Sequence, residues 1–133
     1  IKQMSHFSTI KTQLRKTEPL LKALDQLGFS PNINSKNIKG YQGQITNVDI
    51  SMVLPGDTNV GFKWSKQSNS FELVTDIDLW KYKLPVERFV SKVTQMYAYN
   101  TIISKTKEDG YQLVEQKNEN DGSIELVLTK WES

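Results

Sequence analysis

The side chains of this 133-residue chain that could do chemistry are few and lie far apart in the sequence. His6 is the only histidine, cysteine is absent, and no carboxylate stands at helical spacing from His6. A catalytic dyad or a zinc site needs such neighbours, so His6 is predicted to be structural. Asp76 and Asp78 would lie on one side of a strand and could hold a hard cation, but no glycine-bounded loop of about twelve residues surrounds them. We therefore predict no catalytic residue, no metal site and no cofactor. A site assembled from residues scattered along the chain stays an open alternative.

A set of aromatic residues on the predicted strands offers a different chemistry, the stacking of unpaired RNA bases. The same rings at alternate positions would also form the buried side of a sheet, and the lysines near them form no dense stripe. We therefore favour a role in the core and keep a single-strand RNA-binding module as the alternative function. The rings are those of Tyr41, Phe62, Trp64 and Phe71, and the lysines are Lys39, Lys63 and Lys66.

The charge of the chain argues against a dedicated duplex-DNA binder. Seventeen basic residues oppose fifteen acidic ones, for a net charge of +2, and only Arg15 and Arg88 are arginines. Arginine is the usual residue for bidentate recognition of phosphates and base edges, so its scarcity disfavours sequence-specific readout. The glycines at residues 40–43 are not a phosphate-binding loop, because the required lysine and hydroxyl are missing and the segment leads into a strand.

The long helix predicted over residues 86–107 carries the strongest candidate site. At about 100° per residue, an apolar stripe falls on one face and a mixed group falls opposite. Tyrosine and arginine are favoured interface anchors, so the opposite face is predicted to bind a partner. Alternatively, the aromatic segment around Trp80 and Tyr82 covers this face, or its apolar residues are simply exposed. The core stripe is Val86, Phe89, Val90, Val93, Met96 and Tyr97, and the partner-binding face is Arg88, Gln95, Tyr99 and Ile102.

Two helices and six strands are predicted to position these residues, in the order β-α-β-β-β-α-β-β. Proline, glycine and Asp-Gly signals mark the turns, and period-2 alternation marks the strands. Thr17 is the expected N-cap of the first helix and Gly28 its C-cap. The fold class is α+β, an antiparallel sheet packed by two helices. The strands are expected at residues 5–14, 41–53, 60–64, 71–74, 111–116 and 123–131, and the helices at 17–28 and 86–107.

Length and composition fit one soluble globular domain. Hydrophobic residues make up 37% of the chain and charged residues 24%, which is typical of a folded protein. Residues 4–131 are predicted to form the domain, and residues 1–3, which precede Met4, to be an upstream or vector remnant. No run approaches the roughly 18 apolar residues of a membrane span.

Several segments in order along the chain resemble the conserved hypothetical chloroplast reading frame thirty-five family of plastids and cyanobacteria. The resemblance covers nearly the whole chain from Met4 to Trp131, and residues 1–3 depart from it. It implies no catalytic motif and no residue with a known role. It does imply a location in the plastid stroma, or in the cytoplasm of a cyanobacterium. The segments are residues 4–13, 40–44, 61–64, 86–90, 93–99 and 121–124.

The absence of a convergent polar group and the photosynthetic distribution of the family together suggest a function. We expect a non-catalytic accessory or assembly protein that binds another protein. The expected partner is a photosynthetic complex at the stromal face of the thylakoid, and the chain itself is expected to have no membrane span.

Overall fold

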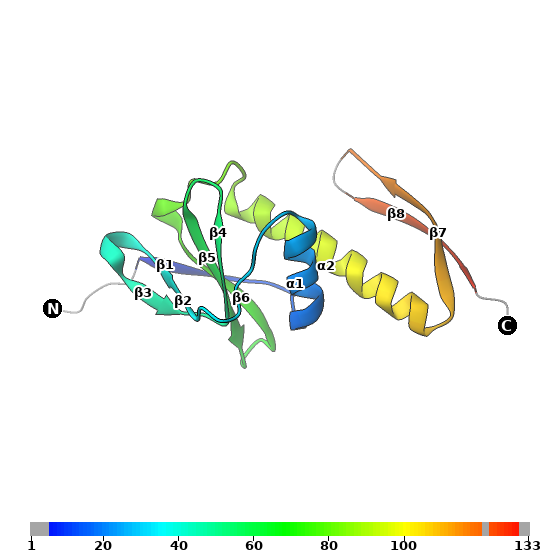
Figure 1. Ribbon diagram of the computed structural model, residues 1–133, viewed down its shortest axis with the longest axis horizontal. Helices are drawn as coiled ribbons and strands as arrows, with labels where there is room; N and C mark the ends of the chain where they lie inside the picture. The colour runs from blue at the N-terminus through cyan, green and yellow to red at the C-terminus, as the bar shows by residue number, and fades with distance from the viewer. Residues whose placement is uncertain (1–5, 121–122, 131–133) are drawn as a thin grey trace.

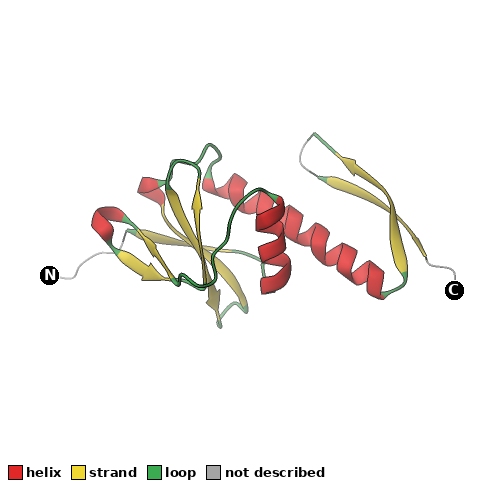
Figure 2. Cartoon of the chain, in the orientation of Figure 1, coloured by secondary structure: helices red, strands yellow, loops and turns green. Residues whose placement is uncertain are grey.

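A four-stranded antiparallel sheet forms the centre of the protein in a computed structural model, which describes residues 6–120 and 123–130. The strand order is β1-β6-β5-β4, with every neighbouring pair antiparallel. Figure 1 shows the sheet with both helices beside it, and Figure 2 shows the same arrangement by secondary structure. The strands are β1 (Phe7–Lys11), β4 (Ile50–Leu54), β5 (Thr58–Ser65) and β6 (Ser70–Asp76).

Helices α1 (Thr17–Gln26) and α2 (Val86–Glu108) cover one face of this sheet. Alternate residues of β4, β5 and β6 point toward the helices, and the strand register sets them side by side. Phe62 lies between Ile50 and Leu73, and all three are at most 2% exposed. The same core takes in Leu20 and Leu24 of α1 and Val86, Phe89 and Val93 of α2.

A short ribbon of two strands, β2 (Asn37–Lys39) and β3 (Ile45–Asn47), belongs to a second apolar cluster. This cluster joins Ile38 and Val48 to Val74 of β6. Because Val74 neighbours Leu73, its side chain lies on the opposite face of the sheet from the helices. The sheet is therefore packed on both faces.

The last two strands, β7 (Tyr111–Asn118) and β8 (Ile124–Lys130), form a hairpin of their own. Figure 1 shows it at the carboxyl end of α2, away from the four-stranded sheet. A helix of 23 residues is about 34 Å long, more than the roughly 27 Å of an eight-residue strand. The second half of α2 therefore extends beyond the sheet and carries the hairpin with it.

The predicted fold class is confirmed: the protein is an α+β domain with two helices and antiparallel strands. The buried residues of α2 also confirm the predicted core stripe at Val86, Phe89 and Val93. Three details were wrong. The extended segment 41–53 is divided between a 3-10 turn and two strands of different sheets, the final hairpin does not join the main sheet, and α1 has Lys16 rather than Thr17 as its N-cap.

Two contacts distant in sequence explain part of these differences. The 3-10 turn Tyr41–Gly43 holds Gln42 at a φ of 53°, and the Asp76 carboxylate fixes the turn by accepting the N–H of Tyr41 at 2.9 Å. Ahead of α1, the Tyr97 hydroxyl accepts the backbone N–H groups of Arg15 and Lys16 at 3.1 and 3.0 Å. The entry into α1 is thus fixed by α2 rather than by a local capping side chain.

Candidate protein-interaction surface

The four residues of the predicted partner-binding face lie on α2 and differ in their surroundings. Arg88 and Gln95 are exposed, and Ile102 is 45% exposed. Tyr99 is only half-buried, and its hydroxyl donates to Oε1 of Gln116 in β7 at 2.8 Å. Tyr99 therefore connects α2 to the hairpin while the other three remain open.

The aromatic segment after β6 does not cover this outer face. The rings of Trp80 and Tyr82 lie 5.8 and 6.1 Å from the ring of Phe89, which is a core residue. The indole N–H of Trp80 donates to the carbonyl of Leu84 at 2.7 Å. The segment therefore completes the core at the start of α2, and the hairpin is the element that reaches Tyr99.

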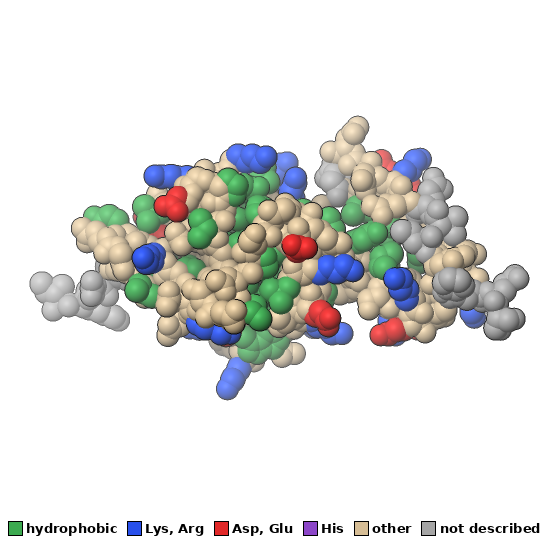
Figure 3. Space-filling view, in the orientation of Figure 1, with side chains coloured by type: hydrophobic (Ala, Val, Ile, Leu, Met, Phe, Trp, Pro, Cys, Tyr) green, Lys and Arg blue, Asp and Glu red, His purple; other side chains and the backbone are tan. Residues whose placement is uncertain are grey.

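One side of the hairpin faces α2 and is only partly covered. Gln116 pairs directly with Leu126, so the two side chains share the side that meets Tyr99. Ile124 and Leu128 alternate with Leu126 along β8 and lie on this side too. Ile124, Leu126 and Leu128 are intermediate in exposure, and none of the three is buried. Figure 3 shows hydrophobic side chains gathered where the hairpin approaches α2.

We call this set the α2–hairpin surface and define it by Tyr99, Ile102, Ile124, Leu126 and Leu128. Its apolar groups come from two elements joined by the turn at Gly110, whose φ is 86°. Sequence reasoning found Tyr99 and Ile102 from the helical wheel. It missed the β8 residues because it assigned β8 to the main sheet, although their alternation was visible as a strand.

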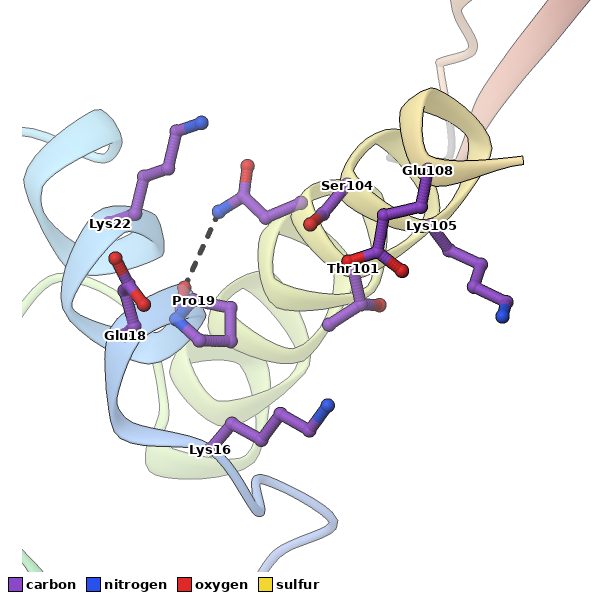
Figure 4. A pocket seen from close by; sticks show the side chains of 9 residues that line it. Lys16, Glu18, Pro19, Lys22, Thr101, Ser104, Lys105 and Glu108 are labelled. Carbon is purple, nitrogen blue, oxygen red and sulfur yellow. Dashed lines mark hydrogen bonds between the residues drawn. The ribbon is translucent and has the colours of Figure 1, made fainter. Parts of the chain in front are cut away.

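A second feature is a cleft of about 380 Å³ between the start of α1 and the second half of α2. Figure 4 shows the side chains of Lys16, Lys22 and Lys105 directed apart, so their ammonium groups do not converge on one point. The Thr101 hydroxyl donates to the carbonyl of Ala98 at 2.9 Å. The cleft thus offers neither a concentrated anion site nor a bonded nucleophile and base among its described residues.

Asn100 at the base of this cleft is the buried polar residue of α2. Its Nδ2 donates to the carbonyl of Pro19 in α1 at 3.4 Å, a long bond, while its Oδ1 is buried without a partner. This amide therefore links the two helices through one long bond.

His6 and Asp76, the residues first considered for chemistry, make contacts within the fold. The His6 ring packs against Tyr41 with centroids 4.6 Å apart, and the Asp76 carboxylate accepts the N–H groups of Tyr41 and Asp78. Within residues 6–120 and 123–130, no three His, Asp or Glu side chains are grouped to hold a metal ion. Neither helix of the described chain has the length and hydropathy needed to cross a bilayer.

The aromatic set is divided by the fold. Phe62 and Phe71 are buried in the core and Trp64 packs against it, as predicted for the core role. Tyr41 stands apart in the 3-10 turn, 43% exposed. The four rings therefore do not form one open platform for stacked bases.

The fold and this surface define a class of protein: a small α+β domain that presents a hairpin on the end of its long helix. Residues 23–127 match the model of a family described as "Protein of unknown function (DUF1257)", and the chain belongs to this family. It is 36% identical over 128 residues to "Uncharacterized protein ycf35" of Pyropia yezoensis, covering 96% of this chain and 98% of the relative. The proteins of the same name from Guillardia theta and Cyanophora paradoxa are 34% and 33% identical with the same coverage.

These relatives confirm the resemblance to the chloroplast reading frame family that the sequence indicated. They are plastid proteins of algae. No solved structure matches the chain.

Proposed function

We propose that this protein is a non-catalytic accessory protein that binds another protein through the α2–hairpin surface. One observation carries the proposal: the apolar residues between α2 and the hairpin are half-buried or exposed, whereas the first half of α2 buries Val86, Phe89 and Val93 in the core. Apolar surface left open next to polar residues is typical of protein-binding sites. Arg88 and Gln95, which are exposed on the same helix, would supply the polar rim.

The setting of the partner is proposed from the family. Relatives in algal plastids support a location in the plastid stroma, or in the cytoplasm for a cyanobacterial member. Photosynthetic complexes at the stromal face of the thylakoid are the partners that best suit this distribution. A partner segment with an apolar side would fill the space between Ile102 and the β8 residues.

Photo-crosslinking from two exposed apolar positions tests this proposal. A photoreactive amino acid at Ile102 would lie within the surface, whereas the same group at Val53 would lie on β4 of the main sheet, 57% exposed. In plastid extract we expect a discrete adduct from position 102 and none from position 53. Equal labelling from both positions, or adducts from position 53 alone, would contradict the proposed surface.

A pair of charge substitutions measures how much the α2–hairpin surface contributes to partner binding. Ile102→Asp should leave the free energy of unfolding within about 0.5 kcal/mol, as exposed changes usually do. It should weaken binding of the crosslinked partner at least tenfold, because burial of an unpaired carboxylate in an interface is costly. Val53→Asp is the matched control and should leave binding unchanged.

A further inference from the structure

We propose that β8 is a self-association edge, at which two copies of this protein join their hairpins into one four-stranded antiparallel sheet. The proposal concerns the outer edge of the hairpin rather than the side that faces α2. It does not rest on the proposed partner-binding function.

The two edges of the hairpin are not alike. Within the described chain, β8 pairs only with β7. β7 has a register shift between Leu113 and Glu115, a bulge that interrupts the regular row of backbone groups on that strand. β8 runs for seven residues without a register shift of its own and without proline. A regular, open edge of this kind is a template for pairing with another strand.

The backbone polarity of β8 follows from the closing bond of the hairpin. The N–H of Glu119 donates to the carbonyl of Ser123 at 2.9 Å. In an antiparallel ladder, alternate residues direct both N–H and C=O toward the same neighbour. Glu125 and Val127 therefore bond toward β7, and the even-numbered residues of β8 direct their groups outward.

These outward groups fit a second copy of the same strand when the pairing is centred on Val127. Even-numbered residues then oppose even-numbered residues, so donors meet acceptors along the whole strand. Leu126 lies opposite Leu128 of the second copy, and Glu125 lies opposite Thr129. Val127 lies opposite itself and Ile124 lies opposite Lys130, so the centre of the pairing is apolar and no like charges stand opposite each other, which favours this register.

The second copy would also add to the cover of the hairpin. A two-stranded hairpin is marginal by itself and is stabilised by packing on a helix or by further strands, and α2 leaves the apolar side chains of β8 only half-buried. The two-fold axis of an antiparallel pair is perpendicular to the sheet, so the α2 helices of both copies would lie on the same face. The result is a four-stranded sheet under two helices, a common two-layer arrangement that covers the half-buried β8 residues further.

Single-cysteine variants test the register, because the natural chain contains no cysteine. Val127 would lie opposite itself in a non-hydrogen-bonded pair with Cα atoms about 4.5 Å apart, within reach of a disulfide. We expect purified Val127→Cys to form a covalent dimer under mild oxidation. Thr129→Cys is the control, because its two copies would lie about 13 Å apart along the strand. Glu125→Cys/Thr129→Cys should restore linkage.

The mass of the purified protein tests the association itself. We expect light scattering after gel filtration to give a dimer for the natural chain and for Val127→Thr, which keeps the branched shape. Val127→Lys sets two like charges opposite each other and should give a monomer at the same concentration. A monomeric natural chain at every concentration, or linkage of Thr129→Cys as fast as that of Val127→Cys, would overturn the proposal. Both measurements use purified protein only, so neither depends on the plastid partner.

Discussion

The packing of Val48 against Gly61 makes the sheet unusually sensitive to one methyl group. A Cβ added to Gly61 would lie 2.8 Å from Cβ of Val48 and 2.9 Å from its Cγ2, with Cγ1 closer still. Val48 is 4% exposed and belongs to the cluster that attaches the β2–β3 ribbon to the sheet. It has no route to solvent, so Gly61→Ala must strain the ribbon or β5.

The expected change in the free energy of unfolding follows from the sizes of the side chains at positions 61 and 48. Overpacking by one methyl group costs about 1–3 kcal/mol, so we expect Gly61→Ala to lower the free energy of unfolding by about 2 kcal/mol. Val48→Ala removes two buried methyl groups and should also cost about 2 kcal/mol. In the double variant the contacts with Cγ1 and Cγ2 are gone, but the contact between the two Cβ atoms at 2.8 Å remains, so only part of the strain is relieved. The total loss should then be about 3 rather than about 4 kcal/mol.

Urea denaturation followed by tryptophan fluorescence measures all three variants, with the m-value as the check that the transition is unchanged. Gly28→Ala is the control, because an added Cβ there meets nothing within 4 Å and only the φ of 90° opposes it. The losses in unfolding free energy caused by Gly28→Ala and by Val48→Ala should be additive in the double variant. If the Gly61 and Val48 changes are also additive within about 0.5 kcal/mol, the steric reasoning is refuted.

The remaining predictions concern the two sides of α2. Val93→Asp places a carboxylate at a position that is 0% exposed and should lower stability by several kcal/mol, whereas Lys92→Asp at the exposed neighbouring position should change little. An unchanged thermal midpoint for Val93→Asp would mean that the other face of α2 is buried. Asn100→Leu removes an acceptor that lacks a partner and should leave the free energy of unfolding equal or up to about 1 kcal/mol higher, measured in urea. A loss of more than about 1 kcal/mol would show that the hydrogen bond to the Pro19 carbonyl stabilises the fold by more than the unpartnered Oδ1 destabilises it.

The sequence predicted the parts of the fold that depend on local pattern. Both helices, the meander of β4, β5 and β6, and the core stripe of α2 follow from helical spacing or alternation, which the burial of Phe62, Phe89 and Val93 confirms. Period-2 and period-3.6 patterns are strong over such lengths because each places one whole side of an element in the core.

The sequence could not predict the features that depend on distant contacts. The carboxylate of Asp76 holds a turn 35 residues earlier in the chain, so the local pattern of residues 41–53 is compatible with one strand until that contact is known. The same limit applies to the site. The helical wheel places Tyr99 and Ile102 on the outer face, but the pairing of Tyr99 with Gln116 depends on where the turn at Gly110 sends the hairpin.

The two halves of α2 differ in a way that connects stability with binding. Val86, Phe89 and Val93 in the first half are buried in the core, whereas Asn100 is the one buried residue of the second half in the described chain. The second half is held instead by the hydrogen bond from Tyr99 to Gln116 of the hairpin and by the bond from Asn100 to the Pro19 carbonyl of α1. Segments with few buried apolar contacts open at a lower free energy than the core. A molecule that covers Ile102 and the β8 residues would therefore order the helix end and the hairpin together, and part of its binding energy would be used to fix them. Both proposed interactions would therefore involve the end of the molecule where the described chain buries the fewest apolar side chains.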